Sequence, residues 1–289
     1  MSTEGVLRVD SAFDVHERKM WAGRAAAYRG SFADLCAHTV DDLLDAAGVP
    51  SAGVAGTDTR AGGGDSVLDV GCGTGSVSAG AVARGARVTG VDAERTMVDA
   101  ARVRVPAAAF REAVLPELPF TEAEFDAVVA NFVINHVGDP KAALAEMRRV
   151  VRPGGRVAVT IWRGAGAEGQ ALFWRALEAA GAERPSGLPR LAAEAEFPRN
   201  EDGFGALLGT TGLHDVRCAA VTWEYRVDPE VWWTAATAGV ATIGLAVGGL
   251  TDGIRARVKQ EYDVLAREFT TPGGELALPH TALLASGVR

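Results

Sequence analysis

Val67-Leu68-Asp69-Val70-Gly71-Cys72-Gly73-Thr74-Gly75 is the stretch of this chain that decides its fold. Its glycines follow a short apolar run, and a helical pattern begins directly after it. Glycine lets the backbone turn sharply and lets a ligand approach closely, which indicates a strand, a binding loop and a helix. The next predicted strand leads to Asp92, an acid placed to accept hydrogen bonds from ribose hydroxyls. The stretch therefore predicts a site for an adenosine-containing cofactor.

The loop does not match the glycine fingerprint of dinucleotide-binding proteins. That fingerprint requires Gly or Ala five positions after its first glycine. Counted from Gly71 the position is Ser76, and counted from Gly73 it is Ser78. A nicotinamide dehydrogenase is therefore a poor interpretation.

Strands and helices alternate around this stretch, with short connections. The predicted strands are Ser66–Val70, Arg87–Val91, Ala107–Phe110, Phe125–Ala130 and Arg156–Trp162, and the predicted helices are Ser76–Arg84, Glu94–Arg104 and Pro140–Val150. Such alternation implies a parallel sheet covered by helices on both faces. We expect a doubly wound, Rossmann-like α/β fold with a mostly parallel sheet, a cofactor-binding core at residues 66–162 and helical cap elements.

The flanking regions are predicted to be largely helical. Residues 10–48 have helical spacing and stop at Gly48-Val49-Pro50, and the Gly-rich residues 51–65 are expected to link this N-terminal flap (1–65) to the core. Residues 163–289 are expected to supply substrate-capping helices and the final strands of the sheet. Their predicted elements are helices Gln170–Ala180, Asp202–Thr211 and Ile254–Phe269, and strands Val216–Val227 and Leu276–Ala285.

Several motifs of the core resemble those of the class I S-adenosylmethionine-dependent methyltransferases. Asp69–Gly75 is similar to the family's first motif, and Gly90-Val91-Asp92 to its ribose-binding acid. Leu118-Pro119-Phe120 followed by Phe125–Val129 resembles its LPF…FDxVV signature, and Arg148–Gly155 its helix-to-strand turn. Residues 273–287 are only weakly similar to the ends of small-molecule members.

The resemblance implies S-adenosylmethionine as the cofactor and a set of cofactor contacts. These are Tyr28, Asp69, Gly71, Cys72, Gly73, Asp92, Ala93, Met97, Val114, Leu115 and Asn131. At one position the chain departs from the family, because Val114 stands where an Asp often receives the adenine amino group. Either the backbone around Leu115 recognises adenine alone, or Glu112 reaches in.

Composition and charge exclude several classes of function. Hydrophobic residues make up 48% of the 289 residues and charged residues 23%, which is typical of a globular protein. The net charge of −8 argues against nucleic acid and anionic membrane as partners. Three scattered cysteines suggest neither a zinc site nor a disulfide framework, so no metal is expected. The N-terminus lacks the apolar core of a secretion signal, and we expect a cytoplasmic protein.

His136, just past the fourth predicted strand, is the candidate catalytic residue. Imidazole can take up a proton near neutral pH, so His136 would serve as a general base, or it merely packs beside the cofactor. Small-molecule methyltransferases similar to this chain often carry His here. The histidines at positions 16, 38, 214 and 280 have no supporting constellation, and Cys72 lacks a base that would make it a nucleophile.

Aromatic residues and an uncharged segment suggest where an acceptor binds. Trp21, Tyr225, Trp232 and Trp233 are candidate substrate contacts, although each could equally be core. Val231–Leu250 has no charged residue, and we expect one buried helix that forms a pocket wall or a homodimer interface rather than a membrane span. A pocket for a carboxylate or phosphate would require Arg or Lys there, so the expected acceptor is neutral and mostly apolar.

These features together predict a methyltransferase acting on O, N or C of a small, largely apolar molecule, such as a specialised natural product. One alternative is a cyclase or isomerase that keeps the cofactor as a scaffold. The other is a non-catalytic S-adenosylmethionine-binding module.

Overall fold

A mixed sheet forms the centre of the molecule, whose computed structural model describes residues 10–50, 64–164 and 166–289. Its strands are Ser66–Val70 (β1), Arg87–Asp92 (β2), Ala109–Glu112 (β3), Phe125–Asn131 (β4), Val151–Trp162 (β5), His214–Val227 (β6) and Leu276–Val288 (β7). In these residues the strand order is β3-β2-β1-β4-β5-β7-β6. Strands β1 to β5 are parallel, whereas β7 is antiparallel to both β5 and β6. The predicted mostly parallel, Rossmann-like sheet is confirmed.

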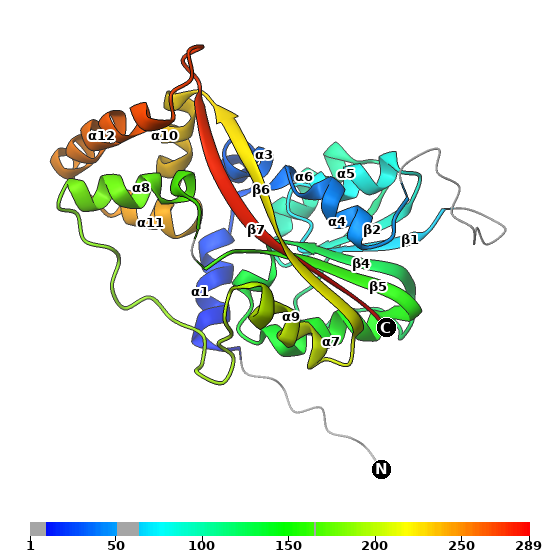
Figure 1. The fold of residues 1–289 in the computed structure, drawn as a ribbon. Helices are drawn as coiled ribbons and strands as arrows, with labels where there is room; N and C mark the ends of the chain where they lie inside the picture. Colours follow the sequence, from blue (N-terminus) through cyan, green and yellow to red (C-terminus); the bar gives the residue numbers. More distant parts are fainter. Residues whose placement is uncertain (1–9, 51–63, 165) are drawn as a thin grey trace.

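Helices cover both faces of this sheet (Figure 1). One face carries α4 (Val40–Ala46), α5 (Ser76–Ala83) and α6 (Arg95–Arg104), and the other carries α7 (Pro140–Val150) and α9 (Glu201–Gly209).

Alternate residues of each strand point to opposite faces, which divides the core into two layers. Val67 and Val129 pack with Leu43 of α4 on one face. Leu68 and the neighbouring strand's Val128 pack with helices α7 and α9 on the other.

Strong local signals gave accurate boundaries for several core elements, but β5 begins at Val151, five residues before the predicted start at Arg156. Helix α7 has the predicted bounds, because Pro140 occupies its first turn and the Asp139 carboxylate accepts the Ala142 N–H at 2.9 Å. Strand β3 lies two residues later than predicted, where parallel pairing with β2 joins Ala109 to Thr89 and Glu112 to Asp92. Its only buried side chain is Phe110, so no clear hydrophobic alternation marked it.

The N-terminal flap consists of four short helices in place of continuous helical structure. They are α1 (Ala12–Trp21), α2 (Ala25–Arg29), α3 (Phe32–Ala37) and α4. Gly23, with φ +69°, separates α1 from α2, and Gly48, with φ +74°, follows the end of α4. The predicted linker is mostly outside the described residues, as is the segment before residue 10.

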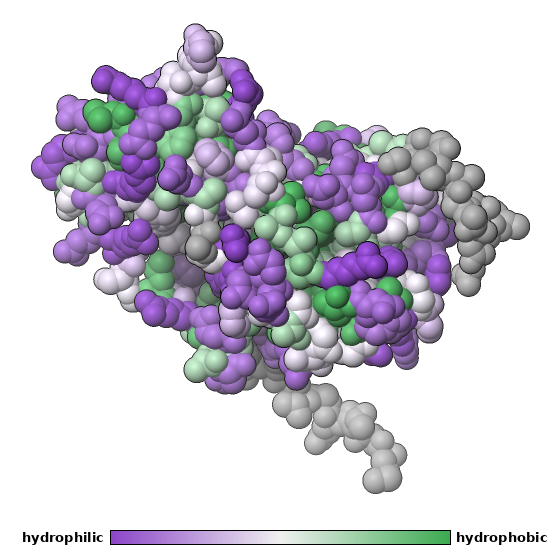
Figure 2. Space-filling view, viewed as in Figure 1, coloured by the Kyte–Doolittle hydropathy of each residue, from purple (hydrophilic) through white to green (hydrophobic). Residues whose placement is uncertain are grey.

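Strands β6 and β7 form a long hairpin that crosses the molecule and extends beyond the sheet (Figure 1). Only Ala282–Val288 of β7 pairs with β5, so Leu276–Thr281 pairs with β6 alone. The projecting part packs against the cap, which consists of α8 (Glu168–Ala179), α10 (Pro229–Thr237), α11 (Ala241–Gly248), α12 (Asp252–Ala266) and the 3-10 turn η2 (Arg267–Phe269). Figure 2 shows mainly hydrophilic side chains over the end formed by α12.

The uncharged segment is two helices, and its prediction as one helix is wrong. Gly239 adopts φ +75° and Ala241 φ +56°, which separates α10 from α11. No single helix in the described part of the chain is long and apolar enough to cross a membrane. Taken together α10 and α11 have sufficient length and apolar composition, but they are bent by 80° at their junction.

Candidate active site

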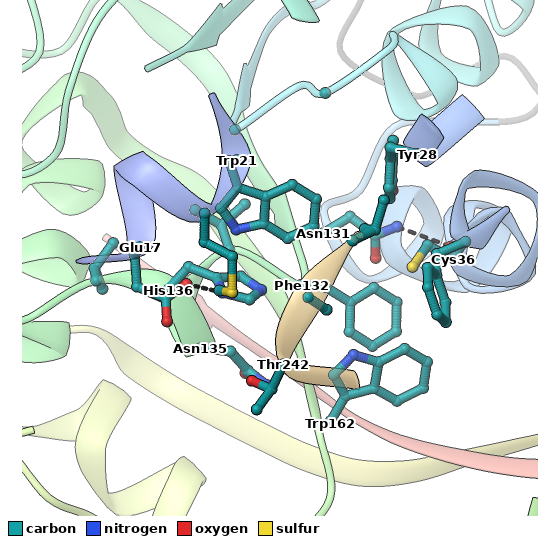
Figure 3. Close-up of a pocket in the computed structure, with 18 of the residues that line it drawn as sticks. Glu17, Trp21, Tyr28, Cys36, Asn131, Phe132, Asn135, His136, Trp162 and Thr242 are labelled. Atoms are coloured by element: carbon teal, nitrogen blue, oxygen red, sulfur yellow. Dashed lines mark hydrogen bonds and ion pairs between the residues drawn. The ribbon is translucent and has the colours of Figure 1, made fainter. Parts of the chain in front are cut away.

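A cavity of about 860 Å³ lies at the carboxyl ends of the parallel strands. The loops after β1, β2, β4 and β5 form its floor, and parts of α1, α8 and α11 form its walls. Figure 3 shows side chains from these distant segments turned toward one space. Ligands bind at this edge in open α/β sheets, so the cavity lies where the sequence predicted a site.

The glycine loop and Asp92 meet at one end of the cavity. The Asp92 carboxylate accepts the N–H of Gly73 and that of Glu94, each at 2.9 Å. Gly71 has φ +64°, and a Cβ there would come within 2.4 Å of Val133. Gly73 has φ +51°, and a Cβ there would meet the Tyr28 ring at 3.5 Å. Glycine is thus required at position 71 by the packing of Val133, whereas a Cβ at position 73 would enter the space in which a ligand approaches the backbone.

Asp92 is held in place by these backbone contacts although its carboxylate is largely removed from water. Desolvation raises the pKa of Asp92, while the N–H groups of Glu94 and Gly73 oppose that rise. Because the carboxylate is fixed beside the loop, it is well placed to accept hydrogen bonds from vicinal hydroxyl groups.

The adjoining wall contains the predicted adenine-side residues. Ala93, Met97, Val114 and Leu115 all line the cavity. Glu112 does not line it, and its carboxylate lies 3.6 Å from the guanidinium of Arg95. The geometry therefore favours the backbone around Leu115 over Glu112 for contact with an adenine ring.

Two predicted cofactor contacts lie beneath the loop and do not line the cavity. Asp69 is 1% exposed and accepts the Ser78 hydroxyl at 2.6 Å, while its other oxygen has no partner in the described residues. Burial raises the pKa of Asp69 to about 7. Cys72 packs against Val98 and Phe110, and burial raises the pKa of its thiol. Both residues support the loop from below, which makes contact with a ligand in the cavity indirect.

Asn131 connects the sheet to the N-terminal flap at the cavity floor. Its amide Nδ2 donates to the carbonyl of Cys36 at 2.9 Å, and its Oδ1 accepts the Thr160 hydroxyl at 2.5 Å. Both amide ends are thus used within the protein, and Asn131 offers mainly its surface to a ligand.

Phe132 follows Asn131 in a backbone conformation that is uncommon for a side chain of its size. It has φ +57°, and its N–H lies 2.9 Å from the Thr160 hydroxyl. Its ring stacks on Trp162 at 4.1 Å between centroids. Strained backbone of this kind gathers at functional sites, and here it turns an aromatic face toward the cavity.

His136 lies at the other end and is paired with a carboxylate. Its Nδ1 lies 2.7 Å from Oε2 of Glu17 on α1, whose side chain is only 11% exposed. A carboxylate can only accept, so Nδ1 is the donor, and in the neutral imidazole Nε2 then has the lone pair. In Figure 3 the imidazole lies between Glu17 and the space bounded by Trp21, Phe132 and Asn135.

Trp21 links the two ends of the cavity. Its ring lies edge-on to Tyr28 at 5.7 Å and to His136 at 5.2 Å between centroids. A Cβ at Gly73 would meet the Tyr28 ring at 3.5 Å, so one indole lies between the side of the glycine loop that faces Tyr28 and the histidine.

The predicted substrate residues divide into two groups. Trp21 and Trp232 line the cavity, but Tyr225 and Trp233 lie behind it in the cap core. Trp232 is 3% exposed and stacks on Phe173, which also lines the cavity. From the uncharged segment only Trp232 and residues 240–243 reach the cavity.

The other histidines are diverse in their surroundings. His16 lines the cavity from α1, and the exposed His214 lies beside Asp215. His38 stacks on Trp223. His280 also lines the cavity, and burial lowers its pKa to about 4, so it is neutral at pH 7.

Sequence reasoning missed Glu17, Phe132 and Trp162. Phe132 and Trp162 end neighbouring strands, so position at the carboxyl edge of the sheet was a usable signal. Glu17 had none, because it is 119 positions away from its partner. In the described residues no group of three or more His, Cys, Asp or Glu side chains could hold a metal ion, and all three cysteines are free thiols.

These observations define a Rossmann-like protein whose sheet edge fits a nucleoside, with an aromatic-lined space in the same cavity. Comparison with known proteins narrows this class. A family model described as a methyltransferase domain matches residues 68–159. An uncharacterised protein of Mycobacterium tuberculosis is 31% identical over 222 residues, which cover 75% of this chain and 74% of that one. The chain belongs to the class I S-adenosylmethionine-dependent methyltransferases, and its cofactor is S-adenosylmethionine.

Curated relatives with named activities match over about a third of this chain. A ubiquinone biosynthesis O-methyltransferase of Alkalilimnicola ehrlichii is 38% identical over 96 residues, 32% of this chain and 39% of that protein. A demethylmenaquinone methyltransferase of Clavibacter sepedonicus is 36% identical over 99 residues, 33% of this chain and 40% of that protein. These matches thus span well under half the length of either relative.

Solved structures share the fold at low sequence identity. A Haemonchus contortus phosphoethanolamine N-methyltransferase 2 complex superposes with a TM-score of 0.55 at 16% identity, covering 97% of this chain and 60% of that one. A protein of Anabaena variabilis described as a methyltransferase from an antibiotic biosynthesis pathway superposes with a TM-score of 0.54 at 16% identity. The match covers 86% of this chain and 96% of that one.

The cavity residues of this chain fit the cofactor. Beside Gly73 the loop leaves room that a Cβ would fill, and Asp92 presents a fixed carboxylate next to it. Gly71, Gly73, Asp92 and Met97 would hold the nucleoside and amino-acid parts, with Leu115 beside the adenine.

Proposed function

We propose that this protein transfers the methyl group of S-adenosylmethionine to a small organic molecule with an apolar body. The observation that carries the proposal is the continuity of one cavity from Gly73 and Asp92 to His136, with Trp21 between them. When bound, the cofactor supplies an electrophilic methyl group on a sulfonium. Alignment of two reactants in one enclosed space is a large part of such catalysis.

In this proposal His136 is the general base. Its Nε2 would take the proton that the reacting atom of the acceptor loses, while the Glu17 carboxylate holds Nδ1–H and stabilises the imidazolium that forms. This arrangement suits an acceptor whose O–H, N–H or acidic C–H is deprotonated during transfer. The names of two relatives, a ubiquinone biosynthesis O-methyltransferase and a demethylmenaquinone methyltransferase, support a small acceptor.

Aromatic side chains would bind the apolar body of the acceptor. Phe132, Trp162, Phe173 and Trp232 surround the inner part of the cavity. They would keep water away from the sulfonium, and their faces would favour its positive charge. The uncharged segment contributes to this wall, whereas a homodimer interface on the same segment is the competing proposal.

The test is a screen of aromatic and apolar acceptors with the wild-type protein and S-adenosylmethionine, read by mass spectrometry. We expect an acceptor that gains one methyl group together with equimolar S-adenosylhomocysteine. His136→Ala should lower kcat by roughly 10²–10⁴ and leave the dissociation constant of S-adenosylhomocysteine unchanged. The exposed histidine variant His214→Ala is the matched control, with wild-type turnover.

The competing functions give different results. An isomerised or cyclised product without added mass and without S-adenosylhomocysteine would indicate the cyclase or isomerase. Tight cofactor binding with no product from any acceptor would indicate the binding module. If His136→Ala turns over at the wild-type rate, His136 is not a general base and only packs beside the cavity. If Trp232→Ala turns a dimeric protein into a monomer but leaves its affinity for the acceptor unchanged, the segment is a dimer interface and not a pocket wall.

A further inference from the structure

Three arginines from segments outside α1 line the cavity. Arg163 follows β5, and Arg184 and Arg199 belong to the segment between α8 and α9. The carbonyl of Arg199 accepts the N–H of Gly164 at 2.8 Å, which places Arg199 beside Arg163 in space. A positively charged rim therefore borders the pocket assigned to the acceptor.

Two of these arginines have no carboxylate partner in the described residues. Arg163 lies 3.3 Å from Glu201. Arg184 instead has its Cζ 4.9 Å from the centre of the Trp174 ring, and Arg199 has its Cζ 5.9 Å from that of Phe197. A guanidinium over an aromatic face keeps its in-plane N–H groups available, and this leaves a fork that matches an anion.

The acidic groups near the rim are already engaged. Asp14 accepts the Gly138 N–H at 2.6 Å and caps α1, and Glu17 is paired with His136. Arg18 on α1 is paired with Asp10. These carboxylates keep their negative charge, but no ion pair within 4.0 Å joins any of them to Arg184 or Arg199 in the described residues, so both guanidinium groups are open to an added anion.

We propose that this rim binds an anionic group of the acceptor, a carboxylate, sulfate or phosphate, through Arg184 and Arg199. The proposal rests on the function proposed above and specifies its substrate class, an apolar body with an acidic end. It departs from the neutral acceptor expected from the sequence. That expectation considered only residues 231–250, which form part of the inner wall, whereas the arginines come from other segments.

The test compares an anionic probe, naphthoate, with a neutral probe of the same aromatic body, naphthalenemethanol, by calorimetry with and without S-adenosylhomocysteine. We expect the wild-type protein to bind naphthoate about tenfold more tightly, the size of a charge-assisted hydrogen bond near the surface. The double variant Arg184→Gln/Arg199→Gln should lose this preference and keep its affinity for naphthalenemethanol. Arg190→Gln, an exposed arginine of the same segment that does not line the cavity, should keep the preference.

Each result has a separate meaning. Equal affinities of the wild type for the two probes, or a preference that survives in the double variant, overturns the anion site. Preference lost equally in Arg190→Gln would indicate a general charge effect and also overturns it. If S-adenosylhomocysteine does not bind but the preference behaves as expected, the anion site holds and the methyltransferase proposal fails. Unchanged S-adenosylhomocysteine affinity in the double variant shows that it is folded.

Discussion

Nδ1 of His136 and Oε2 of Glu17 lie 2.7 Å apart, which joins the first helix of the chain to the loop after β4. The N-terminal flap therefore contributes to the His136 end of the cavity as well as covering it. Gly138 donates its N–H to Asp14 of the same helix at 2.6 Å, so two contacts fix α1 over this loop.

The role proposed for Glu17 can be measured with Glu17→Gln. Glutamine is nearly isosteric but cannot stabilise an imidazolium by charge, and its amide can favour the wrong tautomer. We expect kcat to fall by about tenfold or more, with the acceptor KM and the S-adenosylhomocysteine affinity nearly unchanged. Lys19→Gln, an exposed change on the same helix, is the control. If Glu17→Gln instead raises the acceptor KM and weakens cofactor binding while kcat stays at the wild-type value, Glu17 only holds α1 in place.

Asp92→Ala tests the nucleoside end of the cavity. Loss of this carboxylate removes the acceptor for ribose hydroxyls and leaves the Gly73 N–H without its partner. The affinity for S-adenosylhomocysteine should fall by about 1–3 kcal/mol, measured by calorimetry. Glu112→Gln removes a carboxylate one strand away that lies outside the cavity, and it should bind normally. Equal losses in the two variants would return Glu112 to the list of cofactor contacts.

Gly73→Ala separates backbone strain from loss of ligand space. Gly73 and Gly85 both have positive φ, +51° and +86°, but only Gly73 lines the cavity. Alanine in either position should destabilise the fold by about 1–2 kcal/mol through its left-handed backbone. Only Gly73→Ala should also weaken S-adenosylhomocysteine binding. If both variants bind S-adenosylhomocysteine as tightly as the wild type, Gly73 does not contact the cofactor.

Asp69 predicts a pH-dependent stability of known sign. Its pKa is raised from 3.8 to about 7 in the folded protein, so between pH 4 and pH 7 the unfolded chain loses this proton first. The group thus stabilises the fold at low pH, and that contribution is lost as pH rises through 7. The free energy of unfolding of Asp69→Asn, relative to that of the wild type, should rise by roughly 1–4 kcal/mol as the pH is raised from 4 to 8. Urea unfolding at several pH values measures this, and a difference independent of pH would contradict it.

The sequence predicted the parts of the molecule that local physics determines. Pro140 at a helix start, glycines after a buried strand and an acid at the end of the next strand each act within a few residues. They were sufficient for the parallel sheet, for α7 and for the cofactor end of the cavity. The exact limits of β3 were not predictable, because a single buried Phe110 carries no periodicity.

The acceptor end depends on contacts that no local pattern records. Arg184 and Arg199 lie in a segment without helix or strand, where nothing in the sequence indicates which side chains face a cavity. Tyr225 and Trp233 have the aromatic character expected of a pocket wall, yet packing of α8 and α12 places them in the cap core. Aromatic residues serve both kinds of surface equally well, so only the fold separates them.

The β6–β7 hairpin has a consequence for the evolution and redesign of this protein. Val227, the last residue of β6, is paired with Leu276, the first residue of β7, so the chain leaves the hairpin and returns to it at neighbouring positions. Helices α10, α11 and α12 are thus an insertion whose two ends already meet. Residues 228–275 can therefore be replaced as a block without cutting the sheet or the glycine loop, and the replacement would have to match α8, against which α12 packs. Variation in this block would alter the wall at Trp232 and residues 240–243 while the strand ends beneath the cofactor site keep their connections.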